Sequence, residues 1–289
     1  MEKRLPPWFK QEMPNIDKAP RIQKLLTGLH TVCEEARCPN ISHCLNKGTA
    51  TFLIMGSNCT RNCSFCAIDH GQPLPFDPDE TQRVISAAKK IGLKYVVVTS
   101  VTRDDLPDFG AGAFSQAIYG LHNEKIKVEV LIPDMQGNKK AIDTVIRSHP
   151  EVLAHNIETV PRLYKDVRPG ADYYRSLSVL KYAKQKDPSI VTKSSIMIGL
   201  GETEKEIINT LFDLKDNLCD IVTIGQYLSP SGSHHEVVRY YTPKEFRTIA
   251  KIARFVGFSS VVATPLCRSS YEAKKLYLSI LKTSRNSAK

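Results

Sequence analysis

Residues 50–66 read ATFLIMGSNCTRNCSFC, an apolar run followed at once by three cysteines. The run ATFLIM (50–55) is almost continuously apolar, which is typical of a strand buried on both faces of a sheet. Cys59, Cys63 and Cys66 follow with C-x3-C-x2-C spacing. They lie on the loop that leaves the carboxyl end of this strand, where βα-barrel enzymes build their active sites.

The same strand pattern recurs along the chain. Further β-branched runs are YVVVTS (95–100), KVEVLIP (127–133), VLAHNIE (152–158), IVTKSSIMIG (190–199), DIVTIGQYL (220–228) and SSVVA (259–263). Helix-like stretches alternate with them at 77–93, 137–150, 173–188, 202–217 and 242–257. Strands that alternate with helices indicate βαβ units and a parallel sheet.

About six such units across 50–265 favour a partial (βα)6-type TIM-like barrel, an α/β fold, although a doubly wound sheet remains an alternative. Residues 1–48 and 266–289 fall outside the rhythm, so we predict an N-terminal extension, a barrel over 49–265 and a C-terminal segment. Helix ends carry local signals. Thr242 and Pro243 are a good cap and first helical residue, and Gly92 suits a helix end.

The composition is that of a globular protein. The chain has 289 residues, 42% hydrophobic and 24% charged, which is large enough for a sizeable core. Its first residues, MEKRLPPWFKQEMP, lack the apolar run of a secretory signal, and no stretch approaches the roughly 18 apolar residues of a membrane span. The sequence therefore predicts a cytoplasmic protein without a membrane partner.

The formal net charge is +10. Lys and Arg are scattered rather than gathered in blocks, and no basic stretch is interleaved with aromatic residues, so no nucleic-acid partner is predicted. Two interpretations of the charge stay open: an ordinary solvated surface, or a surface that attracts an acidic protein.

Six of the eight cysteines lie between positions 33 and 66. Besides the first triplet, CEEARCPNISHC (33–44) places Cys33, Cys38 and Cys44 with C-x4-C-x5-C spacing. In a reducing compartment such clusters are metal ligands more often than disulfides. Iron–sulfur clusters and structural zinc sites both use four ligands, and each triplet is one cysteine short. An open position on a four-iron cluster would admit a substrate or cofactor.

The motif CTRNCSFC (59–66) resembles that of the radical S-adenosylmethionine (radical SAM) superfamily. The resemblance implies that Cys59, Cys63 and Cys66 hold a catalytic [4Fe-4S] cluster. The open iron of that cluster would bind S-adenosyl-L-methionine and cleave it to a 5′-deoxyadenosyl radical.

The second triplet narrows the resemblance to lipoyl synthase, a radical SAM sulfurtransferase family. The similarity extends along most of the chain, through LPPWFK (5–10), TSVTRDDLPDFGA (99–111), HNIETVPRLYKDVRPGADY (155–173), GLGET (199–203), QYLSPS (226–231), RYYTPKEF (239–246) and RSSY (268–271). It implies that Cys33, Cys38, Cys44 and Ser270 hold a second, auxiliary [4Fe-4S] cluster, the sulfur donor, so that Ser270 takes part in catalysis.

Three further residues are expected to contact S-adenosylmethionine. Asn156 and Glu158 alternate on the run 152–158, so both can face the barrel interior. A purely structural hydrogen-bonded pair is the alternative. Arg168 could pair with the methionyl carboxylate, or form a surface ion pair. Arg103, Asp104 and Asp105 either bind the partner or cap the next helix, and His234 and His235 are expected on a solvated loop.

The resemblance implies lipoate biosynthesis by protein lipoylation: two sulfur atoms are inserted at C6 and C8 of an octanoyl chain attached to a lysine. The expected partners are octanoylated lipoyl domains of 2-oxoacid dehydrogenase complexes and the glycine-cleavage H protein. A ferredoxin or flavodoxin would supply electrons, and an iron–sulfur carrier protein would repair the auxiliary cluster.

Other functions remain possible at this stage. Within enzymes, the alternatives are a biotin-synthase-like enzyme and an RNA methylthiotransferase. From another class, a non-catalytic iron–sulfur or zinc protein would hold full four-cysteine sites. Three residues depart from the family pattern: Phe109 where glycine is usual, Glu272 where histidine is common, and Cys267 where an apolar residue is expected. Cys267 either packs or approaches the auxiliary cluster, and Cys219 is expected to be a small buried hydrophobe.

Overall fold

A computed structural model describes residues 5–9, 29–32 and 49–287. One parallel sheet runs through it with its strands in chain order, β1 to β7. The strands are β1 (Ala50–Ile54), β2 (Tyr95–Ser100), β3 (Lys127–Leu131), β4 (Val152–Ala154), β5 (Val191–Ile198), β6 (Ile221–Gln226) and β7 (Ser260–Ala263). Each expected apolar run forms one of them. No pairing joins β7 to β1 in the described part of the chain, so the prediction of a partial barrel is confirmed.

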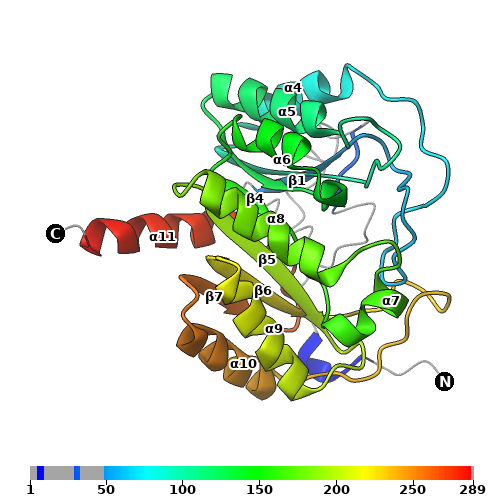
Figure 1. Ribbon diagram of the computed structural model, residues 1–289, viewed down its shortest axis with the longest axis vertical. Coiled ribbons are helices and arrows are strands. Elements are labelled where there is room, and N and C mark those ends of the chain that lie inside the picture. The colour runs from blue at the N-terminus through cyan, green and yellow to red at the C-terminus, as the bar shows by residue number, and fades with distance from the viewer. Residues whose placement is uncertain (1–4, 10–28, 33–48, 288–289) are drawn as a thin grey trace.

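Helices cover the outer face of the curved sheet (Figure 1). They are α4 (Glu80–Ile91), α5 (Ala111–Asn123), α6 (Lys139–Ile146), α7 (Tyr164–Val167), α8 (Tyr173–Lys186), α9 (Glu204–Asp216), α10 (Pro243–Val256) and α11 (Ala273–Ser287), with 3-10 turns at Pro7–Phe9, Met135–Gly137 and Pro161–Leu163. The sequence did not predict α5 or α11. Two glycines weaken the helical signal of α5, and α11 follows the last strand, outside the βα rhythm.

The predicted helix ends are confirmed. Gly92 ends α4 in the left-handed region at φ 77°, where a side chain would be strained. Thr242 caps α10 through a reciprocal pair of hydrogen bonds with Glu245, and Pro243 takes the first helical position. None of the described helices has the length and apolar character needed to cross a bilayer.

Most of the buried apolar side chains lie between the sheet and its helices. One core cluster joins β1, β2 and β3 to α4, α5 and α6, and a second joins β5 and β6 to α8, α9 and α10. Because the middle strands are buried on both faces, their sequences read as continuous apolar runs.

A third cluster closes the amino end of the barrel interior. Tyr95, Val152, Val191 and Ile221 are the first residues of four strands, and they pack against Ala273, Leu276 and Tyr277 of α11. Just inside this layer, Lys193 and Glu129 form a buried ion pair at 2.6 Å. Figure 1 shows α11 at the end of the sheet opposite α7, so the carboxyl ends of the strands stay open.

We expect truncation of Leu276 to loosen this closure. Leu276→Ala should lower the free energy of unfolding by about 2–5 kcal/mol, because Leu276 is only 5% exposed and the strands cannot collapse onto the void. Urea denaturation of the cluster-free protein measures this loss.

The matched control is Leu278→Ala on the same helix, where the side chain is 38% exposed. We expect the control to stay within about 0.5 kcal/mol of the parent chain. Equal losses from the two variants would mean that α11 does not close the barrel.

Candidate active site

A cavity of about 180 Å³ opens at the carboxyl ends of β1 to β4. We call it the cysteine cavity, because Cys59, Cys63 and Cys66 line it together. Its other walls come from the ends of β2, β3 and β4 and from the loops after them, and they include Ser100, His155, Asn156, Glu158 and Arg168. The structure therefore brings the first cysteine triplet and the three expected S-adenosylmethionine contacts to one place.

Backbone hydrogen bonds fix the cysteine loop. The amide of Cys59 donates to the carbonyl of Asp69 at 2.8 Å, and the amide of Ser64 donates to the carbonyl of Val167 at 3.1 Å. The thiol sulfur of Cys59 accepts hydrogen bonds from the amide of Thr102 at 3.3 Å and from that of Arg61 at 3.4 Å. Amide hydrogen bonds to a cluster sulfur ligand are one of the means by which a protein tunes an iron–sulfur centre.

Burial sets the acidity of two of the thiols. It raises the pKa of Cys66 to about 12, and it raises the pKa of Cys63, although the nearby Arg168 acts in the opposite direction. Such thiols are protonated at neutral pH and become thiolates when a metal replaces the proton. Among the described residues, no three His, Cys, Asp or Glu side chains are close enough to share one metal ion. A four-iron cluster makes no such demand, since each thiolate binds a different iron.

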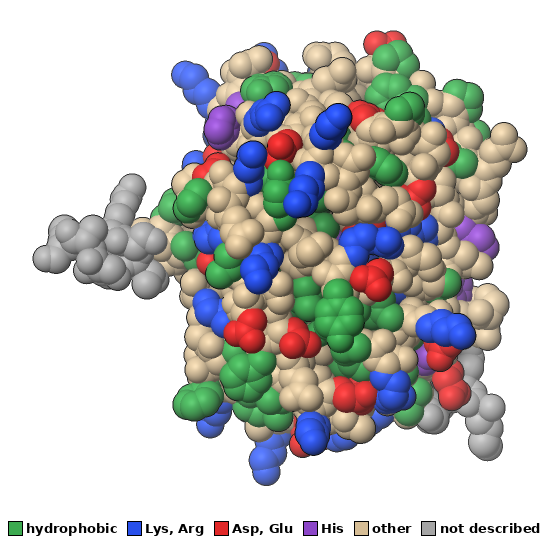
Figure 2. All heavy atoms as spheres, in the orientation of Figure 1, with side chains coloured by type: hydrophobic (Ala, Val, Ile, Leu, Met, Phe, Trp, Pro, Cys, Tyr) green, Lys and Arg blue, Asp and Glu red, His purple; other side chains and the backbone are tan. Residues whose placement is uncertain are grey.

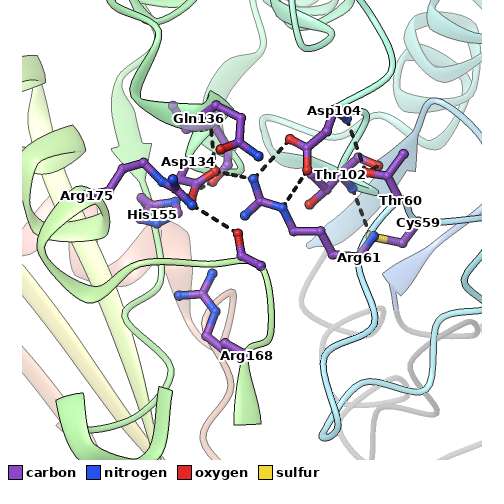
Figure 3. Close-up of polar contacts among 12 residues, drawn as sticks. Cys59, Thr60, Arg61, Thr102, Asp104, Asp134, Gln136, His155, Arg168 and Arg175 are labelled. Carbon is purple, nitrogen blue, oxygen red and sulfur yellow. Dashed lines mark hydrogen bonds and ion pairs between the residues drawn. The ribbon is translucent and has the colours of Figure 1, made fainter. Parts of the chain in front are cut away.

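Arg61, inside the cysteine motif, is held by two carboxylates (Figure 3). Its guanidinium donates to both oxygens of Asp104, at 2.7 and 3.0 Å, and to Asp134 at 2.6 Å. Asp134 is fully buried and also accepts from Arg175 of α8 at 2.7 Å. Burial alone would raise the pKa of Asp134, but the hydrogen bond from Arg61 and the positive charges of Arg61 and Arg175 together outweigh it, and the pKa lies well below its usual range.

This network joins four segments that are distant in sequence. The cysteine loop supplies Arg61, the loop after β2 supplies Asp104, the loop after β3 supplies Asp134 and α8 supplies Arg175. The cysteine loop is therefore tied by charge to three parts of the barrel rim.

His155 faces the cysteine cavity as a neutral hydrogen-bond acceptor. Its Nδ1 lies 2.8 Å from the carbonyl oxygen of Ile132, so Nδ1 carries the proton and donates it. Nε2 is then a lone-pair acceptor, and it is buried without a partner. Burial lowers the pKa of His155 to about 4, and the positive charge of Arg168 acts in the same direction. The ring is thus neutral at physiological pH.

Asn156 and Glu158 lie beyond the end of β4, which stops at Ala154, four residues short of the run that predicted it. The chain leaves the strand conformation, and Glu158 adopts a left-handed φ of 63°. It still bonds to β5, where the amide of Met197 donates to the carbonyl of Glu158 at 2.8 Å. The two side chains bond to each other at 2.9 Å, and Oδ1 of Asn156 is buried without a partner.

Arg168 lies in the cavity wall, so the alternative of a surface ion pair was wrong. The residue is 9% exposed, and its Nη1 donates to the carbonyl of Asn156 at 2.9 Å and to the hydroxyl of Tyr164 at 2.8 Å. Nε has no partner and is buried. The guanidinium is therefore held in place through Nη1, and its Nε donor is left for a ligand.

The C-terminal motif does not line this cavity. Ser270 is half-buried on a turn just before α11. Cys267 is 1% exposed, and burial raises its pKa to about 12, so it packs as a neutral thiol. Cys219 is likewise fully buried, as predicted. The second triplet, Cys33, Cys38 and Cys44, lies outside the described residues.

The two other departures from the family pattern have local explanations. Phe109 sits at φ 55°, a left-handed conformation that explains why glycine is usual there, and its ring packs against the first core cluster. Glu272 also has a left-handed φ, of 51°, and pairs with Lys275 at 2.7 Å.

One loop prediction is corrected. Arg103 is buried and pairs with Asp105, and Asp104 pairs with Arg61, rather than capping the next helix. Asp108 instead accepts from the amides of Gly110 and Gly112 at the start of α5.

His234 and His235 lie half-buried on a largely exposed loop, in keeping with the predicted solvated loop. The Nε2 of His234 also lies 3.0 Å from the carbonyl of Cys66, so this loop contacts the cysteine loop.

Sequence reasoning missed Arg61, Asp134 and His155 as site residues. His155 directly precedes Asn156 at the end of a strand, and that position was a signal that could have found it. Nothing in the sequence pairs Arg61 with Asp134, which is 73 residues away.

We expect Asp134→Asn to loosen the cysteine loop. The change leaves the charge of Arg61 only partly compensated at a buried position, which costs roughly 3–5 kcal/mol of unfolding free energy. Urea denaturation of the cluster-free chain measures it. Asp216→Asn, at the exposed end of α9, is the control and should stay within about 0.5 kcal/mol of the parent. A near-neutral Asp134→Asn would refute the role of the network.

We expect His155 to make stability depend on pH. The unfolded chain protonates histidine near pH 6.5, whereas the folded state resists protonation until about pH 4. Stability is therefore full above pH 6.5 and falls as the pH drops toward 4, by about 3 kcal/mol.

His155→Gln should flatten this part of the profile, since glutamine keeps a donor and an acceptor but does not titrate. Urea unfolding at pH 7.0, 5.5 and 4.5 compares the two slopes, and carboxyl groups common to both proteins cancel in the difference. Identical slopes would contradict the buried neutral state.

Comparison with solved structures shows the fold. The chain is similar to Streptococcus suis SuiB bound to precursor peptide SuiA, with a TM-score of 0.59 and 14% identity over 79% of this chain and 53% of that one. It is also similar to methylornithine synthase (PylB), with a TM-score of 0.56 and 16% identity over 73% of this chain and 70% of that one.

Comparison of sequences is more specific. Residues 53–214 match the profile of the radical SAM superfamily, and residues 1–38 match that of the N-terminal domain of lipoyl synthase. The chain is 52% identical to the lipoyl synthase of Caldanaerobacter subterraneus over 94% of its own length and 97% of that protein. It is 51% identical to the lipoyl synthase of Aquifex aeolicus over 92% and 98%. The chain therefore belongs to the lipoyl synthase family of radical SAM enzymes.

Proposed function

We propose that Cys59, Cys63 and Cys66 hold a [4Fe-4S] cluster whose fourth iron faces the cysteine cavity, and that S-adenosylmethionine binds there. The observation that carries this proposal is that three half-buried thiols share one cavity with four residues that each hold an unpartnered buried polar atom. In the described part of the chain eight such atoms occur, and four of them belong to residues that line this cavity: Ser100 Oγ, His155 Nε2, Asn156 Oδ1 and Arg168 Nε.

The chemistry of these atoms fits S-adenosylmethionine. A buried polar atom without a partner costs about 1–3 kcal/mol, so a ligand that supplies the partner gains that amount. His155 and Asn156 offer acceptors for amino or hydroxyl donors of the ligand. Arg168 offers a charged donor for its carboxylate. Ser100 can serve in either role.

When bound, the cluster and S-adenosylmethionine together supply the 5′-deoxyadenosyl radical that removes hydrogen from C6 and C8 of the octanoyl chain. The residues of this chain orient the cluster loop and the cosubstrate and shield the barrel interior from water. Arg61 holds the cysteine loop in place, Arg168 fixes the cosubstrate, and α11 closes the amino end of the barrel against water. Because the walls are fixed before binding, little ordering remains to be done when the ligand enters.

For the second cluster we propose Cys33, Cys38, Cys44 and Ser270 as ligands and the sulfur atoms of that cluster as the source of the two that are inserted. The support is the family's motif spacing together with the position of Ser270 on a turn held between β7 and α11. Cys267 is left out of this set, because its side chain is 1% exposed and its thiol contacts the carbonyls of Val262 and Arg268.

The carrier of the octanoyl chain is a lipoyl domain. We propose that the 2-oxoacid dehydrogenase complexes and the glycine-cleavage H protein supply it, in the cytoplasm. The net charge of +10 suits an acidic carrier. On the face drawn in Figure 2, Lys and Arg are dispersed among other side chains, so the attraction would be long-range rather than centred on one patch.

Two further requirements are a source of electrons and a means of rebuilding the second cluster. A ferredoxin or flavodoxin would deliver electrons, and an iron–sulfur carrier would rebuild the second cluster. Residues 1–48 and 266–289 would together form the auxiliary-cluster region around the barrel of 49–265.

The test uses anaerobically reconstituted protein mixed with S-adenosylmethionine, dithionite and an octanoyl-lysine peptide. Peptide mass and 5′-deoxyadenosine are followed together. Two sulfur atoms gained alongside deoxyadenosine support the proposal. Deoxyadenosine without sulfur gain, from a protein with both clusters, would move the substrate elsewhere. If neither product forms, the proposed role of the cysteine cavity is refuted.

We expect Ser270→Ala to separate the two chemistries. The variant should still produce 5′-deoxyadenosine, because the cysteine cavity is intact, but sulfur insertion should fall at least about 100-fold, as expected when a ligand is removed. Ser269→Ala, in the same turn, is the matched control and should insert sulfur normally. Full sulfur insertion by Ser270→Ala would exclude the serine as a ligand.

A further inference from the structure

Gly225 is an unusual residue for its place in the sheet. It is the fifth residue of β6, a strand buried on both faces, and it pairs with Met197 of β5. Glycine weakens a strand interior by roughly 0.5–1 kcal/mol, and such a glycine often marks the close approach of another backbone. Its φ is not in the left-handed region, so the backbone conformation does not require glycine. The requirement is therefore one of space.

The space beside Gly225 is taken by the backbone of Cys267. A β-carbon placed on Gly225 would overlap the carbonyl oxygen of Cys267 and lie 3.0 Å from its carbonyl carbon. Both atoms belong to the main chain, so no side-chain rotation can relieve the overlap. By contrast, a β-carbon on Gly232 would meet nothing within 4 Å.

Hydrogen bonds hold the segment 264–268 on both sides of this contact. The amide of Thr264 donates to the carbonyl of Ile224 at 3.1 Å, and the amide of Gln226 donates to the carbonyl of Pro265 at 3.1 Å. Arg268 then bonds through Nη1 to the carbonyl of Gln226 at 3.2 Å.

The same nitrogen of Arg268 bonds to the carbonyl of Cys267 at 2.8 Å, which satisfies the oxygen that faces Gly225. The segment therefore docks on β6 through fixed backbone contacts centred on the glycine.

The turn that carries Ser270 is also anchored at its C-terminal end, where α11 begins. Ala273, the first residue of α11, is 1% exposed in the cluster that closes the barrel. Ser270 lies midway, three residues after Cys267 and three before Ala273. Because the turn is anchored at both Cys267 and Ala273, α11 cannot slide to absorb a displacement of Cys267. Such a displacement must therefore move the turn that carries Ser270.

We propose that Gly225 is a positioning residue for the auxiliary cluster: its missing side chain admits the backbone of Cys267 and thereby sets the place of Ser270. This inference rests on the proposed function, in which Ser270 is a ligand. Gly225 itself touches neither the cluster nor the substrate, and it acts through the turn that follows Cys267.

The test compares Gly225→Ala with Gly232→Ala in the reconstituted full-length protein. Two readouts are independent of turnover. The rate of tryptic cleavage after Arg268, followed by peptide mass, reports whether the segment is docked. Iron content, together with the EPR change on adding S-adenosylmethionine, reports which cluster is present.

For Gly225→Ala we expect cleavage after Arg268 to be at least about 10-fold faster. A loss of about 1.4 kcal/mol from the free energy that holds the segment docked gives that factor. We also expect loss of one cluster of two, with the response to S-adenosylmethionine kept. Gly232→Ala should behave as the parent chain. Parent-like cleavage and iron content in a folded Gly225→Ala would overturn the proposal.

Gly225→Ala could fail to fold, which circular dichroism would reveal. Arg268→Gln then decides, because it removes the bond to Gln226 without adding bulk to β6. Because this variant has no tryptic site at residue 268, its docking is followed by chymotryptic cleavage after Tyr271 in the same turn. Faster chymotryptic cleavage than in the parent chain and loss of one cluster support the docking role, and parent-like behaviour overturns it.

One result separates this inference from the function on which it rests. If Gly225→Ala releases the segment but keeps both clusters, the link from Gly225 to the cluster is wrong. Iron content of Ser270→Ala then locates the error. Two clusters with a parent-like EPR spectrum in that variant show that the serine is not a ligand, whereas loss of one cluster or a changed spectrum shows that the turn holds its place without Gly225.

Discussion

The contact between Arg61 and Asp134 is the interaction on which the open end of the barrel depends. Moving two charges out of water is costly, and the cost is met only when each charge has partners of good geometry. Here Arg61 has two carboxylates, and Asp134 has two guanidinium groups and a backbone amide. Removing either Arg61 or Asp134 would leave the other charged and buried, so the loops of the rim depend on one another.

The two ends of the barrel are built on different physics. At the amino end, apolar first residues of the strands pack against α11, and the interior is closed by the hydrophobic effect. At the carboxyl end, charges and unpartnered polar atoms surround a cavity. The closed end supports the open end. Burying polar groups costs free energy, so the site needs a rigid interior from which water is excluded.

The sequence predicted the architecture because that information is local. Each apolar run, each cap such as Thr242 and the spacing of Cys59, Cys63 and Cys66 lies within a few residues. The rest of the site is non-local. A surface ion pair stayed open as the alternative for Arg168 because its partners, the carbonyl of Asn156 and the hydroxyl of Tyr164, are set by the path of the chain after β4. The helix α5 was missed because tertiary burial of its alanines outweighs two glycines.

The burial that raises the pKa of Cys63 and Cys66 has a consequence for the life of the chain before any metal arrives. Oxidants and alkylating agents react with thiolates, and these two sulfurs are held as thiols. The proposed ligands of a newly made chain are therefore protected from oxidation to sulfenic acid or to a stray disulfide until iron and sulfide arrive. Burial thus keeps two of the three proposed ligands in the less reactive, protonated form of cysteine.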